Sequence, residues 1–298
     1  MPVGVMFPGQ GAQRPGLGEN WQYDEVWAIV TRAERALGRD LSALLLDPEA
    51  DLDRTEDAQL AVLLASLMAW DKAKGTVGEP VAFAGHSLGQ ITALLAAGAL
   101  PFEDGVRLAA RRARHTQEAA DRTAGRMVAL LGATPEQAEL VCAAAPDSCW
   151  VANDNAPGQI VVAGTPEGVD AAVAAAPVAG VRRTIRLQVG GAFHTPLMEE
   201  ARRAFARDLA VAPLADTGTP VVSNGDGRAH GDGAGWRRRL ADHLVRPVRW
   251  RDSVETLVGM GATELVEVGP GTTLAGLARR IAPGVGVRST DDLAEVTV

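Results

Sequence analysis

A single serine between two glycines stands at the junction of two hydrophobic patterns. The segment GHSLG, residues 85–89, follows the short apolar run VAF and precedes the alanine-rich stretch ITALLAAGAL. The short run is typical of a buried strand and the longer stretch of a helix. A G-x-S-x-G sequence between strand and helix makes a sharp turn that exposes the serine oxygen. The segment therefore favours an α/β fold and makes Ser87 a candidate nucleophile.

The same turn predicts hydrogen-bond donors beside the serine. Free N–H groups and the positive end of the helix dipole lie at a helix N-terminus, so the Leu88 N–H is expected to face an oxyanion formed near Ser87. A second glycine-rich turn, FPGQG, follows the first predicted strand, residues 3–7. Arg14 replaces the third glycine of a dinucleotide fingerprint, which argues against a dinucleotide site. We expect this turn to supply the Gln10 N–H as a second oxyanion donor.

The middle of the chain has a different pattern from its two ends. Residues 125–190 run strand, helix, strand, strand, helix, strand, and each helix follows a Thr-Pro pair whose threonine suits an N-cap. This order is that of a ferredoxin-like (βαββαβ) small domain. In 1–124 and 191–298, short and nearly continuous apolar strands alternate with helices, as in a parallel sheet covered on both faces. We predict a large α/β domain from both ends of the chain, with the small domain inserted.

Composition excludes several classes of partner. The 298 residues carry a formal net charge of −8, so we expect no nucleic-acid partner. No uncharged run reaches the roughly 18 residues that span a bilayer, and the start lacks a signal-peptide pattern, so we predict no membrane contact and a cytoplasmic location. Cys142 and Cys149 form no C-x-x-C pair and do not cluster with histidine. We therefore predict neither a metal site nor a disulfide framework.

A serine of ordinary pKa needs a general base, and the chain has five histidines. His194 lies in GGAFHTPLM, just after the last strand of the predicted insert, where the loop faces back toward the large domain. It is the preferred base. His86 adjoins the serine, but its side chain points to the other side of the turn, so we predict a structural role. In an α/β-hydrolase the histidine lies near the C-terminus, and His243 is the best base under that alternative.

Taken together, these segments resemble the malonyl-CoA:acyl carrier protein transacylase family and the related acyltransferase domains of polyketide synthases. The resemblance covers nearly the whole chain, in order through FPGQGAQ, EDAQLAV, AGHSLGQITAL, RRARHTQEA, ANDNAPGQIVVAG, GAFHTPLM, HLVRPVRW and VEVGPGTTLAGLARRI. It implies a hydrolase-like large domain with a ferredoxin-like insert, which agrees with the predicted division. It also implies Ser87 as nucleophile, His194 as base, and Gln10 and Leu88 as oxyanion donors.

The resemblance further implies the substrates. The acyl group comes from a coenzyme A thioester and passes to the phosphopantetheine thiol of an acyl carrier protein, with no permanently bound cofactor. The reaction is ping-pong, through an acyl ester on the serine. In this family the histidine is held largely by main-chain carbonyls, and we expect the VEVGP stretch, residues 266–270, near it.

The resemblance also assigns substrate-binding positions. It places a glutamine on Gln59 and an asparagine in the stretch ANDN, for which we take Asn155. The arginine that holds the malonyl carboxylate falls on Arg112, with Arg111 and Arg114 as neighbouring alternatives. A carboxylate in a partly dry pocket requires a planar cation that forms two hydrogen bonds, so an arginine there indicates a malonyl group.

Several positions depart from the family pattern. Gln90 stands where glutamate is common, and we expect this to matter little for the chemistry. Thr116 and His115 replace bulky apolar residues, which predicts a wider acyl pocket. Phe193 instead fits a malonyl-selective pocket, because an aromatic ring beside the base leaves little room for an α-methyl branch. Malonyl is the favoured acyl group, and a larger or unusual acyl group, including one passed from carrier to carrier, is the alternative.

Two further function classes make different predictions. An editing acyl hydrolase on the same fold would lack the carboxylate-binding arginine and release free acid. A non-catalytic carrier-binding homologue would not need an intact serine and histidine. We favour a discrete enzyme that acts in trans, in fatty acid or polyketide synthesis. The carrier is expected to be acidic, so contact should involve local basic patches, for which we take Arg237 to Arg239, Arg279 and Arg280.

Overall fold

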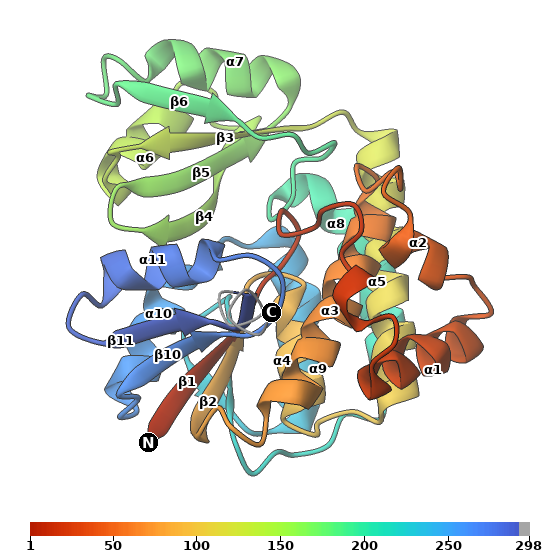
Figure 1. The fold of residues 1–298 in the computed structure, drawn as a ribbon. Coiled ribbons are helices and arrows are strands. Elements are labelled where there is room, and N and C mark those ends of the chain that lie inside the picture. The colour runs from red at the N-terminus through yellow and green to blue at the C-terminus, as the bar shows by residue number, and fades with distance from the viewer. Residues whose placement is uncertain (292–298) are drawn as a thin grey trace.

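The computed structural model describes residues 1–291 and places their strands in two β-sheets (Figure 1). The larger sheet has the order β11-β10-β1-β2-β7-β8, and its neighbours are parallel except for β7 and β8. Its strands are β1 (Pro2–Phe7), β2 (Glu79–Gly85), β7 (Val221–Val222), β8 (Ala229–His230), β10 (Glu264–Glu267) and β11 (Gly286–Ser289). The predicted parallel sheet is confirmed.

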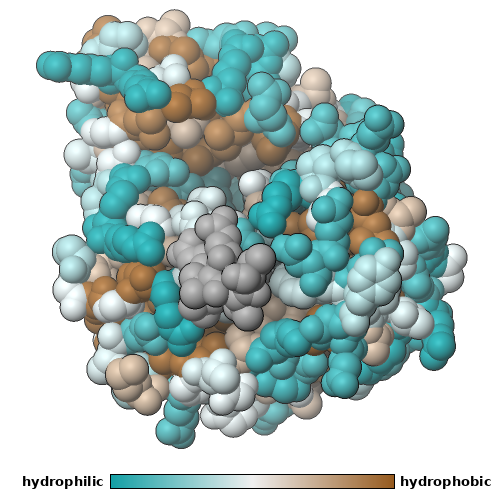
Figure 2. Space-filling model, viewed as in Figure 1, coloured by the Kyte–Doolittle hydropathy of each residue, from teal (hydrophilic) through white to brown (hydrophobic). Residues whose placement is uncertain are grey.

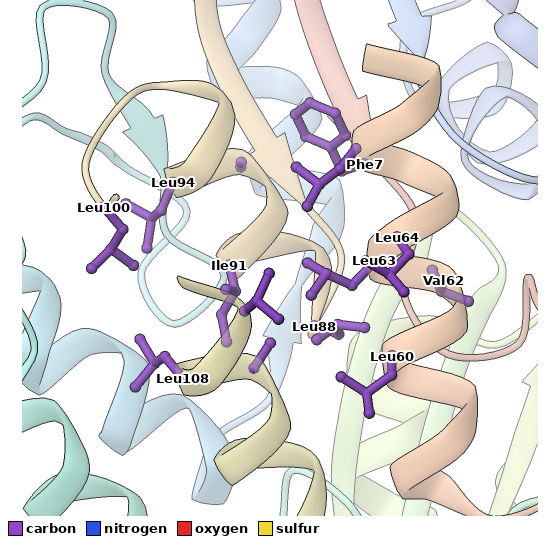
Figure 3. Packing of buried hydrophobic residues seen from close by; sticks show 14 of the residues in the cluster. Phe7, Leu60, Val62, Leu63, Leu64, Leu88, Ile91, Leu94, Leu100 and Leu108 are labelled. Atoms are coloured by element: carbon purple, nitrogen blue, oxygen red, sulfur yellow. The ribbon is translucent and has the colours of Figure 1, made fainter. Parts of the chain in front are cut away.

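Helices cover both faces of this sheet because its central strands alternate their apolar side chains. Phe7 packs against α3 and α4 on one face (Figure 3), whereas Met6 and Ala84 pack with α10 and α11 on the other. The helices of the large part are α1 (Ala28–Leu37), α2 (Ser42–Leu46), α3 (Thr55–Ala73), α4 (Gly89–Ala96), α5 (Phe102–Arg122), α8 (Glu199–Val211), α9 (Gly233–Asp242), α10 (Trp250–Gly259) and α11 (Thr273–Ile281). Among residues 1–291 the large part also has four short 3-10 helices: η1 (Glu19–Trp21), η2 (Glu25–Trp27), η3 (Pro196–Met198) and η4 (His243–Val245).

The smaller sheet carries its own two helices in the predicted order. The elements are β3 (Arg126–Leu131), α6 (Pro135–Cys142), β4 (Cys149–Ala156), β5 (Gln159–Gly164), α7 (Pro166–Ala175) and β6 (Arg183–Arg186). Thr134 and Thr165 cap the two helices by accepting from main-chain N–H groups, as the Thr-Pro pairs predict. The fold class is therefore confirmed, an α/β fold with a second, ferredoxin-like sheet.

One strand of the smaller sheet comes from outside the predicted insert. β9 (Val248–Arg249) pairs in parallel with β4 and forms an edge of that sheet. The boundaries 125 and 190 remain a prediction, because this pairing ties the small sheet to a distant part of the chain. The last strand of the predicted insert is regular only over β6, four residues that end before residue 190.

Residues 24–46 form three short elements, η2, α1 and α2. α1 ends at Gly38, which adopts a left-handed conformation with φ of 64°, and α2 follows after a turn. Glycine accepts this conformation without a Cβ penalty, so the chain reverses there. Within residues 1–291, no helix has both the length and the apolar character required to cross a membrane.

The carboxyl ends of three neighbouring strands define one edge of the large sheet. Residues 8–11 follow β1, residues 86–88 follow β2 and Asn224 follows β7 closely. Parallel strands end at the same edge, and ligands of open α/β sheets bind there. The fold thus brings the two glycine-rich turns of the sequence side by side.

Candidate active site

The serine sits in a turn that tolerates only glycine at its flanks. A Cβ added to Gly85 would lie 1.9 Å from the Gly89 main chain, and one added to Gly89 would lie 2.3 Å from the Phe7 carbonyl oxygen. Ser87 itself has a positive φ of 54°, a conformation that costs a non-glycine residue about 1–3 kcal/mol. The buried Leu88 side chain anchors the turn in the core (Figure 3). This strained turn presents the Ser87 hydroxyl above the sheet edge.

His194 meets the serine from the loop after the small sheet. Its Nε2 lies 2.8 Å from Ser87 Oγ, and its Nδ1 lies 3.0 Å from the His243 carbonyl oxygen. Burial lowers the pKa of His194 to about 3, because the charged ring loses its hydration, although the His243 carbonyl partly offsets this effect. The ring is therefore neutral at pH 7. The supporting carbonyl belongs to the HLVRP segment, and the position of VEVGP near His194 remains a prediction.

The two predicted oxyanion donors border the same cavity as the serine. Gln10 and Leu88 both line it, and within residues 1–291 neither main-chain N–H makes a hydrogen bond. A Cβ on Gly9 would lie 2.3 Å from the His86 carbonyl oxygen, so glycine permits the close approach of the two turns. The Gln10 side chain donates to Thr55 Oγ1 over 3.2 Å and holds its loop against α3.

Arg112 brings a buried positive charge to the serine. Its Nη2 lies 3.0 Å from Ser87 Oγ and its Nη1 lies 2.5 Å from Gln59 Oε1. No carboxylate within residues 1–291 forms an ion pair with it, and burial lowers its pKa to about 10, which still leaves it charged at pH 7. Its neighbours face elsewhere, Arg111 toward Asp208 and Arg114 toward Glu118. Of the three arginines, the structure places Arg112 alone in the cavity.

Thr116 fixes the orientation of the Gln59 amide. Gln59 Nε2 donates to Thr116 Oγ1 over 3.1 Å, so Gln59 Oε1 is left facing Arg112. The prediction that His115 helps to shape the acyl pocket is wrong. Successive residues of a helix point about 100° apart, and His115 instead meets Asp208 over 2.7 Å in a separate groove between α5 and α8.

The cavity has one polar and one apolar side. It has a volume of about 280 Å³ and lies between the two sheets. Its apolar wall comes mainly from the small sheet and the loop after it, through Met127, Ala129, Val161, Leu187 and Val189. Figure 2 shows hydrophobic side chains on the upper lobe, above the hollow that separates it from the lower lobe.

The structure brings the remaining predicted residues to the same cavity. Phe193 and Asn155 both line the cavity. Asn155 Oδ1 lies 2.9 Å from His86 Nε2, and the His86 ring packs against Trp250. His86 thus makes the structural contacts that its position in the turn predicted. Asn155 connects the small sheet to the serine turn.

The sequence did not predict that three buried side chains beside the site would support it. Asn224 Oδ1 accepts from the Ser87 N–H over 2.8 Å, and the Asn224 N–H donates to Gln90 Oε1 over 2.8 Å. Gln90 Nε2 in turn lies 2.8 Å from His243 Nδ1. His243 faces the His194 ring and is not the base of an α/β-hydrolase triad. A polar residue two positions after a parallel strand was the available signal for Asn224.

Most of the arginines expected to contact a carrier are engaged within the protein. Arg239 pairs with Asp232 and Arg237 donates to the Ala212 carbonyl. Arg280 donates to Gln159 and to the Pro157 carbonyl, which joins α11 to the β4–β5 turn. Among residues 1–291, no group of three or more His, Cys, Asp or Glu side chains is arranged to hold a metal ion.

A serine turn at the carboxyl edge of a parallel sheet, beside a neutral histidine, is the arrangement of enzymes that work through a serine ester. Residues 5–284 match the family described as "Acyl transferase domain". The chain belongs to this acyltransferase family.

Named relatives agree along nearly the full length. The malonyl CoA-acyl carrier protein transacylase of Bacillus subtilis (strain 168) is 35% identical over 286 residues, 94% of this chain and 90% of that protein. The crystal structure of a malonyl-CoA:acyl carrier protein transacylase from Xanthomonas oryzae has a TM-score of 0.92 and 37% identity, with 99% and 96% coverage. A malonyl-transacylase in complex with its type II PKS acyl-carrier protein has a TM-score of 0.93 and 32% identity, with 100% and 98% coverage.

Proposed function

We propose that this protein transfers a malonyl group from coenzyme A to the phosphopantetheine thiol of an acyl carrier protein, through an ester on Ser87. The buried guanidinium of Arg112 carries the proposal, because it lies 3.0 Å from the nucleophilic oxygen without a carboxylate partner in residues 1–291. A buried cation left without a counter-ion is costly, and a malonyl carboxylate supplies that counter-ion with two hydrogen bonds.

The first half-reaction forms the ester. His194 Nε2 accepts the Ser87 proton while the oxygen attacks the thioester carbonyl carbon, and the main-chain N–H groups of Gln10 and Leu88 donate to the oxyanion. Collapse breaks the carbon–sulfur bond, and the coenzyme A thiolate takes the proton from His194. The neutral ring is suited to this role, because burial holds its pKa far below 7.

The second half-reaction repeats these steps with the carrier thiol. His194 accepts the thiol proton, the sulfur attacks the ester, and Ser87 recovers its proton as the carbon–oxygen bond breaks. The apolar wall of the small sheet lowers the water content beside the ester, which favours transfer over hydrolysis. No bound cofactor takes part in this proposal, and the cytoplasm remains the predicted location.

The presence of Arg112 also bears on the alternatives. An editing hydrolase was expected to lack this arginine, so its position supports transfer of a charged acyl group. The short side chain of Thr116, which lines the cavity, favours a larger acyl group. We keep malonyl as the proposed substrate, because Phe193 lines the same cavity and restricts branching beside the base.

Intact-protein mass spectrometry tests the proposal. The enzyme is mixed separately with malonyl-, methylmalonyl- and acetyl-CoA, and carrier protein is then added. We expect a malonyl adduct that is absent in Ser87→Ala, lost in Arg112→Ala and passed to the carrier. Arg111→Ala is the matched control and should keep the adduct, since Arg111 pairs with Asp208 outside the cavity. An adduct that decays to free acid, or none from any of the three donors, would contradict the proposal.

A further inference from the structure

A closed circuit of hydrogen bonds links the main chain at the serine to the histidine. The Ser87 N–H donates to Asn224 Oδ1, and the Asn224 N–H donates to Gln90 Oε1, each over 2.8 Å. Gln90 Nε2 meets His243 Nδ1 at 2.8 Å. The His243 carbonyl meets His194 Nδ1 at 3.0 Å, and His194 Nε2 returns to Ser87 Oγ at 2.8 Å. Gln90, Asn224 and His243 are almost wholly buried.

The proton positions in this circuit follow from one main-chain group. A main-chain N–H can only donate, so Gln90 Oε1 accepts from Asn224 and the Gln90 NH₂ group must be the donor toward His243. His243 Nδ1 therefore accepts, and the proton of the neutral ring lies on Nε2. A carbonyl can only accept, so His194 carries its proton on Nδ1 and offers the Nε2 lone pair to the serine.

We propose that Gln90 is a positioning residue for the Ser87–His194 pair, contrary to the expectation from the family pattern that a glutamine there matters little for the chemistry. It holds His243 in the neutral, Nε2-protonated form and ties the segment after β7 to η4. The catalytic part rests on the proposed function of Ser87 and His194. The tautomer assigned to His243 does not depend on that function, because it follows from the hydrogen bonds alone.

The need for an amide at this position follows from the charges that face His243. Its ring centroid lies 4.5 Å from that of His194, and Arg112 and His86 also act on it. A charged His243 would oppose formation of the His194 imidazolium during proton transfer. A glutamate in place of Gln90 would favour a charged His243, because its carboxylate would accept a hydrogen bond from a protonated Nδ1. The amide donates to Nδ1 and so excludes the charged ring.

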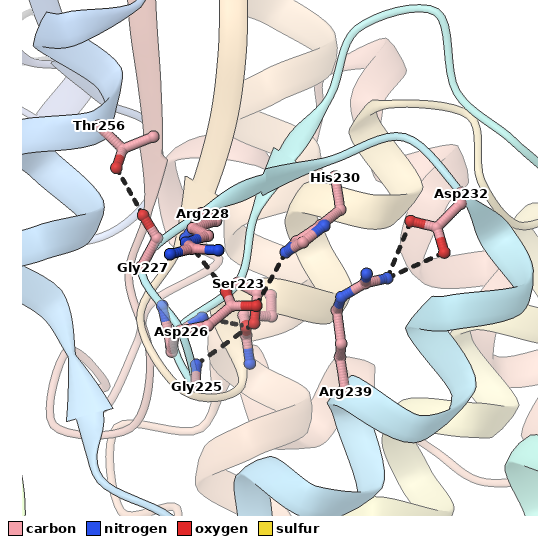
Figure 4. Close-up of polar contacts among 11 residues, drawn as sticks. Ser223, Gly225, Asp226, Gly227, Arg228, His230, Asp232, Arg239 and Thr256 are labelled. Carbon is pink, nitrogen blue, oxygen red and sulfur yellow. Dashed lines mark hydrogen bonds and ion pairs between the residues drawn. The ribbon is translucent and has the colours of Figure 1, made fainter.

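Hydrogen bonds hold in place the turn that carries Asn224. Asn224 follows β7, and residues 225–228 lead into β8 (Figure 4). Asp226 accepts from the Arg228 N–H over 3.1 Å and meets His230 Nε2 at 2.9 Å. Thr256 Oγ1 donates to the Gly227 carbonyl over 2.5 Å. These contacts fix the turn to α10, so Asn224 presents its side chain to Ser87 from a rigid support.

Histidine NMR tests the tautomer directly in the wild-type enzyme. Protein labelled with ¹⁵N-histidine gives ring correlations that distinguish the two neutral tautomers and the imidazolium, and His243→Gln assigns the His243 signals. At pH 7 we expect His243 protonated on Nε2 and His194 protonated on Nδ1. An Nδ1-protonated or charged His243 would overturn the proposal, whatever reaction the enzyme catalyses.

Kinetics test the positioning role, and the main readout is a reaction that needs no acyl donor. Phosphonylation of Ser87 by a fluorophosphonate, with release of fluoride, measures the reactivity of the serine alone. We expect Gln90→Glu to slow it on the order of 10²-fold, the scale of a misplaced catalytic group, with little change in the KM of malonyl-CoA. In the swapped pair, which is the double variant Gln90→Glu with His243→Gln, the amide donor and its acceptor exchange positions. The hydrogen bond between the two side chains is restored, so most of the rate should be recovered.

The controls separate this idea from a loss of stability and from the proposed function. Thermal unfolding of Gln90→Glu and of the swapped pair shows whether each variant folds. An unchanged phosphonylation rate in a folded Gln90→Glu variant, or no recovery in a folded swapped pair, contradicts the positioning role. If Ser87 reacts as expected with the fluorophosphonate but no acyl-CoA forms an adduct, the proposed function fails while the positioning role stands.

Discussion

Ser87 Oγ and His194 Nε2 lie 2.8 Å apart although 107 positions separate the two residues in the chain. Both have a positive φ, 54° for Ser87 and 62° for His194, and no other non-glycine residue within 1–291 has one. Strained conformations persist only where the surrounding structure determines them, and they gather at functional sites. The coincidence of strain and contact at the same two residues supports the roles proposed for them.

The strain at Ser87 predicts a difference between two inactive variants. Ser87→Ala and Ser87→Gly remove the same hydroxyl, but only glycine adopts a φ of 54° without strain. We expect Ser87→Gly to be the more stable of the two by about 1 kcal/mol in the free energy of unfolding. Urea denaturation at pH 7.5 measures the difference. Equal stability, or a more stable alanine variant, would show that the turn is relaxed in the protein.

The contact between Thr116 and Gln59 predicts an effect on malonyl binding. Thr116→Val keeps the shape of the side chain but removes the oxygen that accepts from Gln59 Nε2. The Gln59 amide is then free to turn its NH₂ group toward Arg112, which misdirects the guanidinium. We expect the KM of malonyl-CoA to rise about tenfold, the scale of one hydrogen bond to a charged group. Steady-state transfer to a carrier protein measures it.

Thr116→Ser is the matched control for that variant. Serine keeps the accepting hydroxyl, so its KM should stay near the wild-type value. Similar constants for the serine and valine variants would mean that the hydroxyl does not orient Gln59.

Local patterns predicted the fold and the serine turn well. The GHSLG turn is recognisable because its two glycines, its serine and both flanking elements are contiguous, and the structure shows that a Cβ on Gly85 has no room. The order of the small domain was equally visible, because Thr134 and Thr165 mark the starts of its helices. The resemblance to a known family added Arg112. It agreed with His194, which its place just after the predicted insert had already made the preferred base.

The support of the site was not predictable, because it depends on contacts between distant segments. Gln90 meets His243 across 153 positions and Asn224 across 134 positions. Each residue alone is an ordinary polar side chain, and only the folded chain shows that all three are buried together. The expectation that His115 shapes the acyl pocket was wrong for a local reason. Its neighbour Thr116 lines the cavity, but the helix turns His115 toward Asp208.

Crowding at the serine turn predicts a large effect from the smallest side chain. Gly85→Ala would place a Cβ 1.9 Å from the Gly89 main chain, so the strand and helix must separate. We expect a loss of more than about 3 kcal/mol in the free energy of unfolding, or no folded protein. Gly276→Ala is the control, since that Cβ meets nothing within 4 Å inside α11. It should raise stability by roughly 0.5–1 kcal/mol. Equal effects at the two sites would contradict the close packing.

Three buried histidines predict how stability depends on pH. Burial lowers the pKa of His86, His194 and His243 below the ordinary 6.5. As the pH falls through 6.5, the unfolded chain binds protons at these rings and the folded protein does not, so the free energy of unfolding decreases. With a folded pKa of about 3, His194 alone should account for about 2 kcal/mol of this loss between pH 7.5 and 5.0.

Urea denaturation at several pH values between 7.5 and 5.0 measures this dependence. Carboxylates such as Glu199, whose pKa is lowered to about 2 by hydrogen bonds from Arg202 and Arg203, begin to lose their contribution only below about pH 4.5. They therefore do not affect the chosen range. His194→Gln removes one of the three titrating rings, so its stability should fall by about 2 kcal/mol less than that of the wild type over the same range. If both proteins lose the same amount, His194 is not held neutral by burial, and its role as a base that is ready at pH 7 loses its physical support.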